Sequence, residues 1–204
     1  MFNAATPLSD PGVSTPSPSA IAVADLNKDG KPDIVMANQM NGGVTVFLSN
    51  AAGTAFTLKG SYSAGATLPA GITIGDFVGD SNLDVAVSLN GTGYISILPG
   101  DGTGALGPFV RYSAMEAATD APIGLANADF NADGVPDIVA ALNGNTKVAV
   151  ILNTNKTPAA PVLFTSGANP RAVAVGDIDS DGRIDLAVAN QGDNQVSILL
   201  NSSQ

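Results

Sequence analysis

An aspartate-rich segment of ten residues recurs four times along the 204-residue chain. The copies begin at Asp25, Asp76, Asp129 and Asp177, so that successive copies start 51, 53 and 48 residues apart. This period is too long for a solenoid of helix pairs and fits one four-stranded propeller blade per repeat. The sequence therefore predicts a repeat protein with four similar units.

Each unit contains three short apolar runs that have the length and the β-branched composition of strands. The first run precedes the aspartate segment, the second follows it, and the third comes after a turn. The first runs are 20–24, 71–75, 123–128 and 171–176, the second runs are 34–37, 85–89, 138–142 and 186–189, and the third runs are 44–48, 94–98, 148–152 and 196–200. Asn-Gly pairs at 41–42, 90–91 and 143–144 predict tight hairpins between the second and third strands.

Aromatic residues indicate a fourth, outer strand in each of the first three units. These residues are Phe56, Tyr62, Phe109, Tyr112 and Phe164. The last unit has no such strand before Gln204, whereas the N-terminal residues 1–10 contain Phe2. We expect residues 1–10 to pair with the last unit and to close the ring, which would remove an exposed sheet edge.

The expected fold is all-β, a β-propeller of four-stranded antiparallel blades that forms a single domain over residues 1–204. The expected blades are roughly 17–66, 67–118, 119–167 and 168–204, the last completed by 1–10. Two other assemblies stay open. Two chains could join into an eight-bladed ring, which would make the protein a homodimer, or the chain could be part of a larger array.

The aspartate segments carry oxygen-bearing side chains at alternate positions, which is the pattern that a hard cation such as Ca²⁺ requires. Side chains at positions 1, 3, 5 and 9 and the carbonyl of position 7 are the predicted ligands. In the first segment they are Asp25, Asn27, Asp29, Lys31 and Asp33; in the third, Asp129, Asn131, Asp133, Val135 and Asp137; in the fourth, Asp177, Asp179, Asp181, Arg183 and Asp185. A glycine at position 6 permits the sharp turn. The alternative is an Asx-rich turn that binds nothing.

The second segment departs from this pattern. It keeps Asp76, Asp80, Asp84 and the carbonyl of Asn82, but position 3 is Val78 and position 6 is Ser81. We therefore expect three calcium sites and a fourth that is weak or empty. An EF-hand is excluded because position 12 is Met36, Ala140 or Val188 in the other three segments, where a glutamate is needed.

Charge and composition narrow the classes of function. The net charge is −10, and the aspartate segments hold 13 of the 18 acidic residues. This concentration indicates that the carboxylates serve as metal ligands. Eight Lys and Arg residues, spread singly, form no basic stripe, which makes nucleic acid and membrane surfaces poor partners. The chain has no Cys and no His, so it lacks the nucleophile or the general base that most familiar hydrolase mechanisms require.

Residues 20–38 and 172–190, AIAVADLNKDGKPDIVMAN and AVAVGDIDSDGRIDLAVAN, closely resemble the motif of the FG-GAP/VCBS repeat family. Blades of this family also build the integrin α-subunit propeller and some fungal lectins. The resemblance implies a calcium-binding β-propeller that is usually secreted or surface-attached, with metal at positions 1, 3, 5, 7 and 9. Family propellers commonly have seven blades, so four repeats are a departure.

The expected function is a non-enzymatic extracellular module that presents loops to a protein or glycan ligand, with calcium in a structural role. Weak calcium sites would be mostly empty in the cytosol, which favours a secreted or cell-surface protein, although residues 1–20 do not read as a signal peptide. A lectin is one alternative, with Tyr62, Tyr94 and Tyr112 as the available tyrosines. The other is a polysaccharide-acting enzyme that uses Glu116 and Asp120, a pair that no motif supports.

Overall fold

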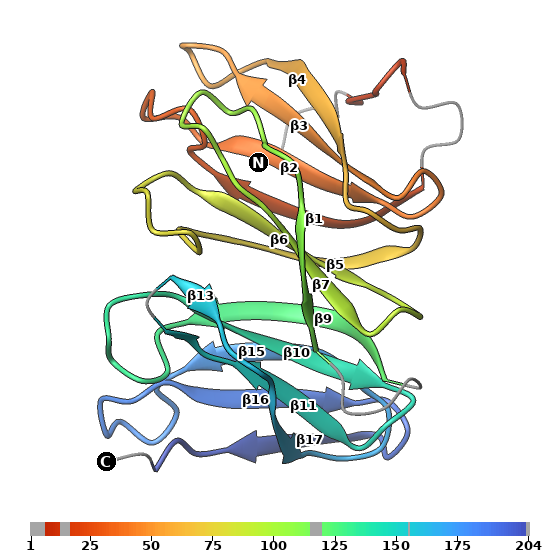
Figure 1. Ribbon diagram of the computed structural model, residues 1–204, viewed down its shortest axis with the longest axis vertical. Helices are drawn as coiled ribbons and strands as arrows, with labels where there is room; N and C mark the ends of the chain where they lie inside the picture. The colour runs from red at the N-terminus through yellow and green to blue at the C-terminus, as the bar shows by residue number, and fades with distance from the viewer. Residues whose placement is uncertain (1–6, 13–16, 115–119, 155, 203–204) are drawn as a thin grey trace, which may run out of the picture.

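The structure is a computed structural model that describes residues 7–12, 17–114, 120–154 and 156–202 (Figure 1). These residues form strands and turns and contain no helix, so that part of the chain offers no apolar helix of membrane-spanning length. The strands are β1 (Pro18–Ala24), β2 (Asp33–Asn38), β3 (Gly43–Ser49), β4 (Phe56–Ser63), β5 (Pro69–Gly75), β6 (Asp84–Leu89), β7 (Tyr94–Leu98), β8 (Val110–Ser113), β9 (Ala121–Ala128), β10 (Asp137–Asn143), β11 (Lys147–Ile151), β12 (Asn153–Thr154), β13 (Thr157–Pro158), β14 (Val162–Thr165), β15 (Pro170–Gly176), β16 (Asp185–Asn190) and β17 (Gln195–Leu199).

Four antiparallel sheets follow one another along the chain, one for each predicted repeat. Their strand orders are β1-β2-β3-β4, β5-β6-β7-β8, β9-β10-β11-β14 and β15-β16-β17, and β12 and β13 form a small hairpin of their own. The predicted strands and the outer strands at Phe56, Phe109 and Phe164 are confirmed, although Phe109 itself lies just before β8. We call these sheets the first to the fourth.

The hydrophobic core lies between successive sheets. Because side chains alternate across a strand, each of the two inner sheets turns one apolar face to the sheet before it and the other to the sheet after it. Val35 and Val46 of the first sheet pack against Val85 and Leu98 of the second. Two further clusters join the second sheet to the third and the third to the fourth. Burial of one such side chain stabilises the fold by about 1.5–3 kcal/mol.

The first strands of the sheets lie next to one another, β1 beside β5, β5 beside β9 and β9 beside β15. Glycine is required where these backbones crowd together. A Cβ atom on Gly71 would lie 2.1 Å from the carbonyl oxygen of Ile123, and one on Gly124 would lie 2.6 Å from that of Arg171. The abundance of small residues in the first strands therefore reflects close packing along their shared line.

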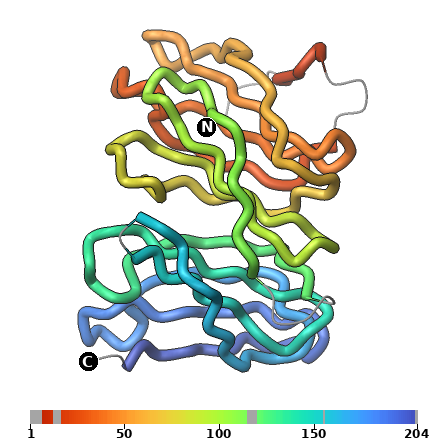
Figure 2. The backbone as a smooth tube through the Cα atoms, viewed as in Figure 1, coloured from red at the N-terminus to blue at the C-terminus, as the bar shows by residue number. Residues whose placement is uncertain are grey.

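Figure 2 shows the sheets stacked from the N-terminal end of the molecule to the C-terminal end. The structure does not show the expected ring closure. Among the described residues β17 has no outer partner. Residues 1–6 lie outside the described part, and Asp10 contacts the first sheet, where its carboxylate accepts hydrogen bonds from the hydroxyls of Thr45 and Ser61.

Candidate metal centre in the aspartate loops

Each aspartate segment forms the loop between the first and second strands of its sheet, and the loops share one hydrogen-bond pattern. The carboxylate at position 1 accepts two backbone N–H groups from positions 5 and 6. In the first loop Asp25 accepts from Asp29 at 3.1 Å and from Gly30 at 2.8 Å. The same pair of bonds recurs at Asp76, Asp129 and Asp177. All four loops are thus wound around the first aspartate.

Positions 3 and 5 support the turn from within. Asn27 accepts the N–H of Asp29 at 3.1 Å, and Asp29 accepts the N–H of Lys31 at 2.9 Å. The bond from position 7 to position 5 recurs in every loop, made by Asn82, Val135 and Arg183. The side chain of Val78 has no acceptor atom, so the second loop lacks the hydrogen bond that the N–H of position 5 donates to the side chain of position 3 in the other loops.

The aspartate at position 9 is a buried brace in every loop. Asp33 has no exposed surface and accepts the N–H of Leu26 at 3.0 Å and that of Ser49 at 2.9 Å. The first bond holds the start of the loop, and the second holds the end of the third strand. Asp84, Asp137 and Asp185 are equally buried and make the equivalent bonds.

The protonation of this buried aspartate differs between sheets. Burial raises the pKa of Asp84 and of Asp137 above the usual aspartate value, although backbone N–H groups bonded to each carboxylate act in the opposite direction. In the fourth sheet the N–H groups of Asn201 and Ile178 lower the pKa of Asp185. A cation near Asp84 or Asp137 would offset the unfavourable burial of their charge.

The second loop has the same backbone path as the other loops, although its glycine stands at position 4 and not at position 6. Positions 4 and 6 have positive φ in every loop, for example 60° at Lys28 and 81° at Gly30. In the second loop position 4 is Gly79 with φ of 68°, and position 6 is Ser81 with φ of 70°. Ser81 therefore leaves the turn intact, and the missing oxygen at Val78 remains as the main difference from the other loops.

Two lysine side chains reach the second loop, which the sequence analysis did not predict. The ammonium group of Lys28 in the first loop donates to Oδ1 of Asn82 at 2.7 Å. The ammonium group of Lys156, from the β12–β13 hairpin, donates to the carbonyl of Gly79. Both contacts cross between sheets, so no local motif signals them. They bring positive charge to the loop that has the fewest oxygen donors.

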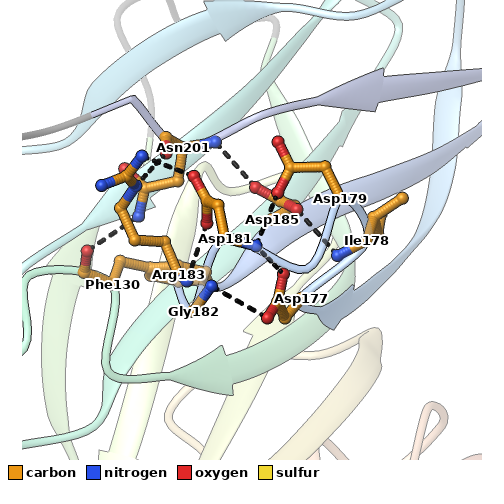
Figure 3. Close-up of polar contacts among 9 residues, drawn as sticks. All are labelled: Phe130, Asp177, Ile178, Asp179, Asp181, Gly182, Arg183, Asp185 and Asn201. Carbon is orange, nitrogen blue, oxygen red and sulfur yellow. Dashed lines mark hydrogen bonds and ion pairs between the residues drawn. The ribbon is translucent and has the colours of Figure 1, made fainter.

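The fourth loop gathers the most complete cluster of carboxylates (Figure 3). Ligand oxygens of Asp177, Asp179 and Asp185 all lie within 4.8 Å of one another. Asp181, also a predicted ligand, is paired with the guanidinium group of Arg183 at 2.5 Å. Arg183 also donates from Nε to the carbonyl of Asn201 at 2.8 Å.

The donor set fits a calcium ion, since it consists of oxygens and Ca²⁺ takes six to eight of them. The structure brings the predicted side chains of each loop onto one short turn. The loops also contain hydrogen bonds from backbone N–H groups to Asp and Asn side chains, which are those of an Asx-rich turn. The turn geometry that the sequence offered as an alternative is therefore present as well. Calcium binding and the Asx-turn geometry are therefore compatible within one loop.

The residues considered for other functions lie elsewhere. Tyr62 and Tyr94 are half-buried against the core between the first two sheets, and Tyr112 packs between the second and third. Asp120 is buried and accepts a hydrogen bond from the side chain of Asn145 at 2.5 Å. Glu116, its suggested partner, lies outside the described residues.

A pocket of about 420 Å³ adjoins the third and fourth loops. Its lining is mainly apolar and comes from the third and fourth sheets, and its polar residues are Asn131, Asn201 and Ser202. The residues that line it are Phe130, Asn131, Val150, Leu152, Val162, Phe164, Ile184, Leu186, Leu199, Leu200, Asn201 and Ser202. No motif in the sequence predicts this pocket, because the residues that line it come from two repeats.

A family model for FG-GAP-like repeats matches residues 25–87 and 129–188, which is more than half of the chain. The chain belongs to the FG-GAP-like repeat family. Each matched segment of this FG-GAP protein begins at position 1 of an aspartate loop, the first loop and the third. A search of curated protein sequences found no significant match.

Solved structures with a similar fold include propeller-like proteins of distant sequence. The chain is similar to BBS1N in its complex with ARL6DN, with 14% identity and a TM-score of 0.63 over 95% of this chain and 59% of that one. It is similar to a putative 6-phosphogluconolactonase from Bacteroides uniformis, with 16% identity and a TM-score of 0.67 over 91% of this chain and 50% of that one.

A third similar structure is an Agrocybe aegerita lectin that recognises non-reducing terminal N-acetylglucosamine. It has 19% identity and a TM-score of 0.55 over 89% of this chain and 48% of that one. The FG-GAP chain thus spans between about half and three fifths of the length of these structures. At such identities the likeness concerns the fold alone.

Proposed function

We propose that this FG-GAP protein is a calcium-stabilised recognition module that works outside the cell and is not an enzyme. The observation that carries the proposal is the fourfold repetition of one loop geometry with a buried aspartate as brace, in which three of the loops carry oxygen side chains at positions 1, 3, 5 and 9. Such loops sit at the corners of a rigid stack of sheets, where binding surfaces are commonly built.

Calcium would be held by the side chains at positions 1, 3, 5 and 9 of the first, third and fourth loops, and weakly by Asp76, Asp80 and Asp84 of the second. When bound, the ion neutralises clustered carboxylates and fixes the loop between its two strands. With a Kd near 10⁻⁴ M, typical of extracellular modules, about 1 mM free calcium adds roughly 1.4 kcal/mol of stability per site. The ion therefore has a structural role in this proposal.

A protein ligand fits the surface better than a glycan. The tyrosines that could form a platform for a sugar ring are half-buried against the core, and the pocket beside the third and fourth loops is mainly apolar. The likeness to a lectin supports the fold only, so sugar recognition rests on no residue of this chain. The buried, hydrogen-bonded Asp120 fits a structural role.

Titration calorimetry of metal-free protein with CaCl₂ tests the proposal. We expect heat from about three sites, lost one site at a time in Asp25→Ala, Asp129→Ala and Asp177→Ala. Asp193→Ala is the matched control, because this carboxylate lies outside the loops and bonds the N–H of Ala168. Absence of calcium heat, with the fold intact by circular dichroism, would overturn the proposal. A glycan array in saturating calcium then separates a lectin from a protein-binding module.

A further inference from the structure

In the first three sheets, one face packs against the next sheet along the chain. The corresponding face of the fourth sheet is exposed. Val196 and Ile198 of β17 are 66% and 50% exposed. They pair in register with Ala189 and Ala187 of β16, which lie on the same face of the sheet. This set of apolar side chains on the fourth sheet, Ala187, Ala189, Val196 and Ile198, is called the forward face.

The forward face has a buried equivalent in the first sheet. There Val44 pairs with Ala37 and Val46 pairs with Val35, at the same distances from the buried aspartate of the loop. All four of these side chains are fully buried, because the second sheet covers them. The same register in the third sheet holds Val139, Ala141, Val148 and Val150, and the three valines pack into the cluster shared with the fourth sheet. The fourth sheet repeats this pattern with nothing covering it among the described residues.

The first sheet exposes the opposite half of the same contact. Ile21 and Val23 of β1 are 65% and 60% exposed. Their equivalents in the second sheet, Ile72 and Ile74 of β5, pack into the cluster between the first and second sheets. Those in the fourth sheet, Val173 and Val175 of β15, pack likewise against the third sheet. Ile21 and Val23 are called the rear face.

The packing inside the molecule shows how these two faces would meet. The first strand of each later sheet lies against the second strand of the sheet before it, β5 on β2, β9 on β6 and β15 on β10. By this rule β16 would receive the strand β1 of another molecule. Within this molecule the two faces do not cover each other, as their exposure shows.

We propose that the occupant of each face is a second copy of this chain, bound head to tail. The rear face of one copy lies on the forward face of the other, and the second pair of faces closes the assembly into a ring of eight sheets. Such a closed dimer has two identical interfaces, each between the forward face of one copy and the rear face of the other, and a twofold axis relates the two interfaces. The length of the chain agrees with this assembly, because one copy of the chain covers 48% to 59% of the length of the similar propeller-like structures.

The first sheet limits where the second copy can sit. Thr45 of β3 is buried and already bonded to Asp10 of its own chain, so the contact is confined to β1 and β2. Apolar contact without charged partners is expected at the centre of the interface, since the forward and rear faces contain no ionisable residue. The proposal does not depend on calcium in the loops, so its test is run with calcium and with chelator.

Light scattering with sedimentation tests the proposal on the 204-residue chain. We expect a mass of twice the 20.2 kDa of one chain. The double variants Val196→Asp/Ile198→Asp and Ile21→Lys/Val23→Lys should each raise the dimer dissociation constant by roughly 100-fold or more. Val110→Lys is the matched control, because this valine of β8 is 49% exposed and belongs to neither face. It should leave the mass unchanged.

Mixing the two double variants identifies the faces. Each variant keeps one intact face, so the mixture should recover an association that neither variant shows alone. Association of the Ile21→Lys/Val23→Lys variant with itself through its forward face would overturn the head-to-tail proposal in favour of a like-face dimer. A monomeric mass for the unaltered chain up to roughly millimolar concentration would overturn the dimer itself. Circular dichroism of each variant confirms that the exposed substitutions leave the fold in place.

Discussion

At the scale of single residues, the buried aspartate at position 9 connects the metal loop with the sheet. Its two oxygens accept backbone N–H groups from opposite sides, in the first sheet one in the loop and one at the end of the third strand. The same side chain is a predicted calcium ligand. A residue with both roles would link the occupation of the metal site to the position of the third strand. Any shift of the carboxylate would change its hydrogen bonds to both N–H groups.

Replacement of Asp137 by alanine should be costly even without metal. The buried N–H of Asn153 and the partly buried N–H of Phe130 would both lose their acceptor, at about 1–3 kcal/mol each. We expect a total loss of roughly 2–6 kcal/mol in the free energy of unfolding, measured by denaturant titration in chelator. Asp133→Ala in the same loop removes an exposed carboxylate and should cost under about 1 kcal/mol. Equal losses would contradict the role of a brace.

The metal-free protein should become more stable as the pH falls from neutral towards mild acid. Burial raises the pKa of Asp84 and Asp137 above the ordinary value of 3.8, so the folded state takes up these protons before the unfolded state does. Stability therefore rises as the pH falls through the raised pKa values and levels off below 3.8.

Two other aspartates act in the opposite direction but in a different pH range. A hydrogen bond from Ser61 lowers the pKa of Asp10, and backbone N–H groups lower that of Asp185. Their contribution is fully present above 3.8 and is lost below it. Melting temperatures of chelated protein across this range check the prediction, and the Asp84→Asn/Asp137→Asn variant should lose the acid gain. A steady fall in stability from neutral pH to pH 4 would contradict it.

At the scale of elements, the loops and strands were largely predictable because the four repeats align with one another. The strand runs, the hairpin turns and the outer strands could be placed from periodicity and from the recurring aspartates. The contacts of Lys28 and Lys156 with the second loop could not, because they join residues 54 and 77 positions apart. The glycine exchange between Gly79 and Ser81 was visible in the sequence, but its meaning required the backbone angles.

Conversion of Val78 to asparagine should turn the second loop into a better calcium site. The variant restores the donor that the first and third loops carry at position 3, on a turn that already has the same backbone path. Calorimetry should show one additional site or a tenfold tighter weak site, about 1.4 kcal/mol. Val78→Ala is the control and should leave the number of sites unchanged. No gain in the asparagine variant would show that the two lysines, not the missing oxygen, weaken this loop.

The crowding of the first strands gives a separate test at this scale. Gly71→Ala would place Cβ within 2.1 Å of the carbonyl of Ile123, and the backbone cannot yield easily there. We expect a loss of about 2–4 kcal/mol in the free energy of unfolding. Gly176→Ala is the matched control, since no atom lies within 4 Å of its Cβ position. It should be neutral or slightly stabilising. Equal effects of the two changes would contradict close packing of β5 on β9.

At the scale of the whole molecule, the chain is a stack of sheets whose cores lie between the repeats and not within them. Each sheet needs a neighbour on both faces, which explains why the first and fourth sheets leave apolar residues exposed. The sequence predicted a ring closed by residues 1–10, and the structure does not show it. Sequence patterns report which residues face a neighbour, but they do not specify whether that neighbour belongs to the same chain.

The central claim is that calcium in the aspartate loops stabilises the stacked sheets, and unfolding measured with and without calcium tests it most directly. About 1 mM free calcium should raise the free energy of unfolding by roughly 4 kcal/mol over chelated protein, shared among three sites. The gain should fall by about a third in Asp177→Ala. Identical unfolding curves in calcium and in chelator would contradict the claim.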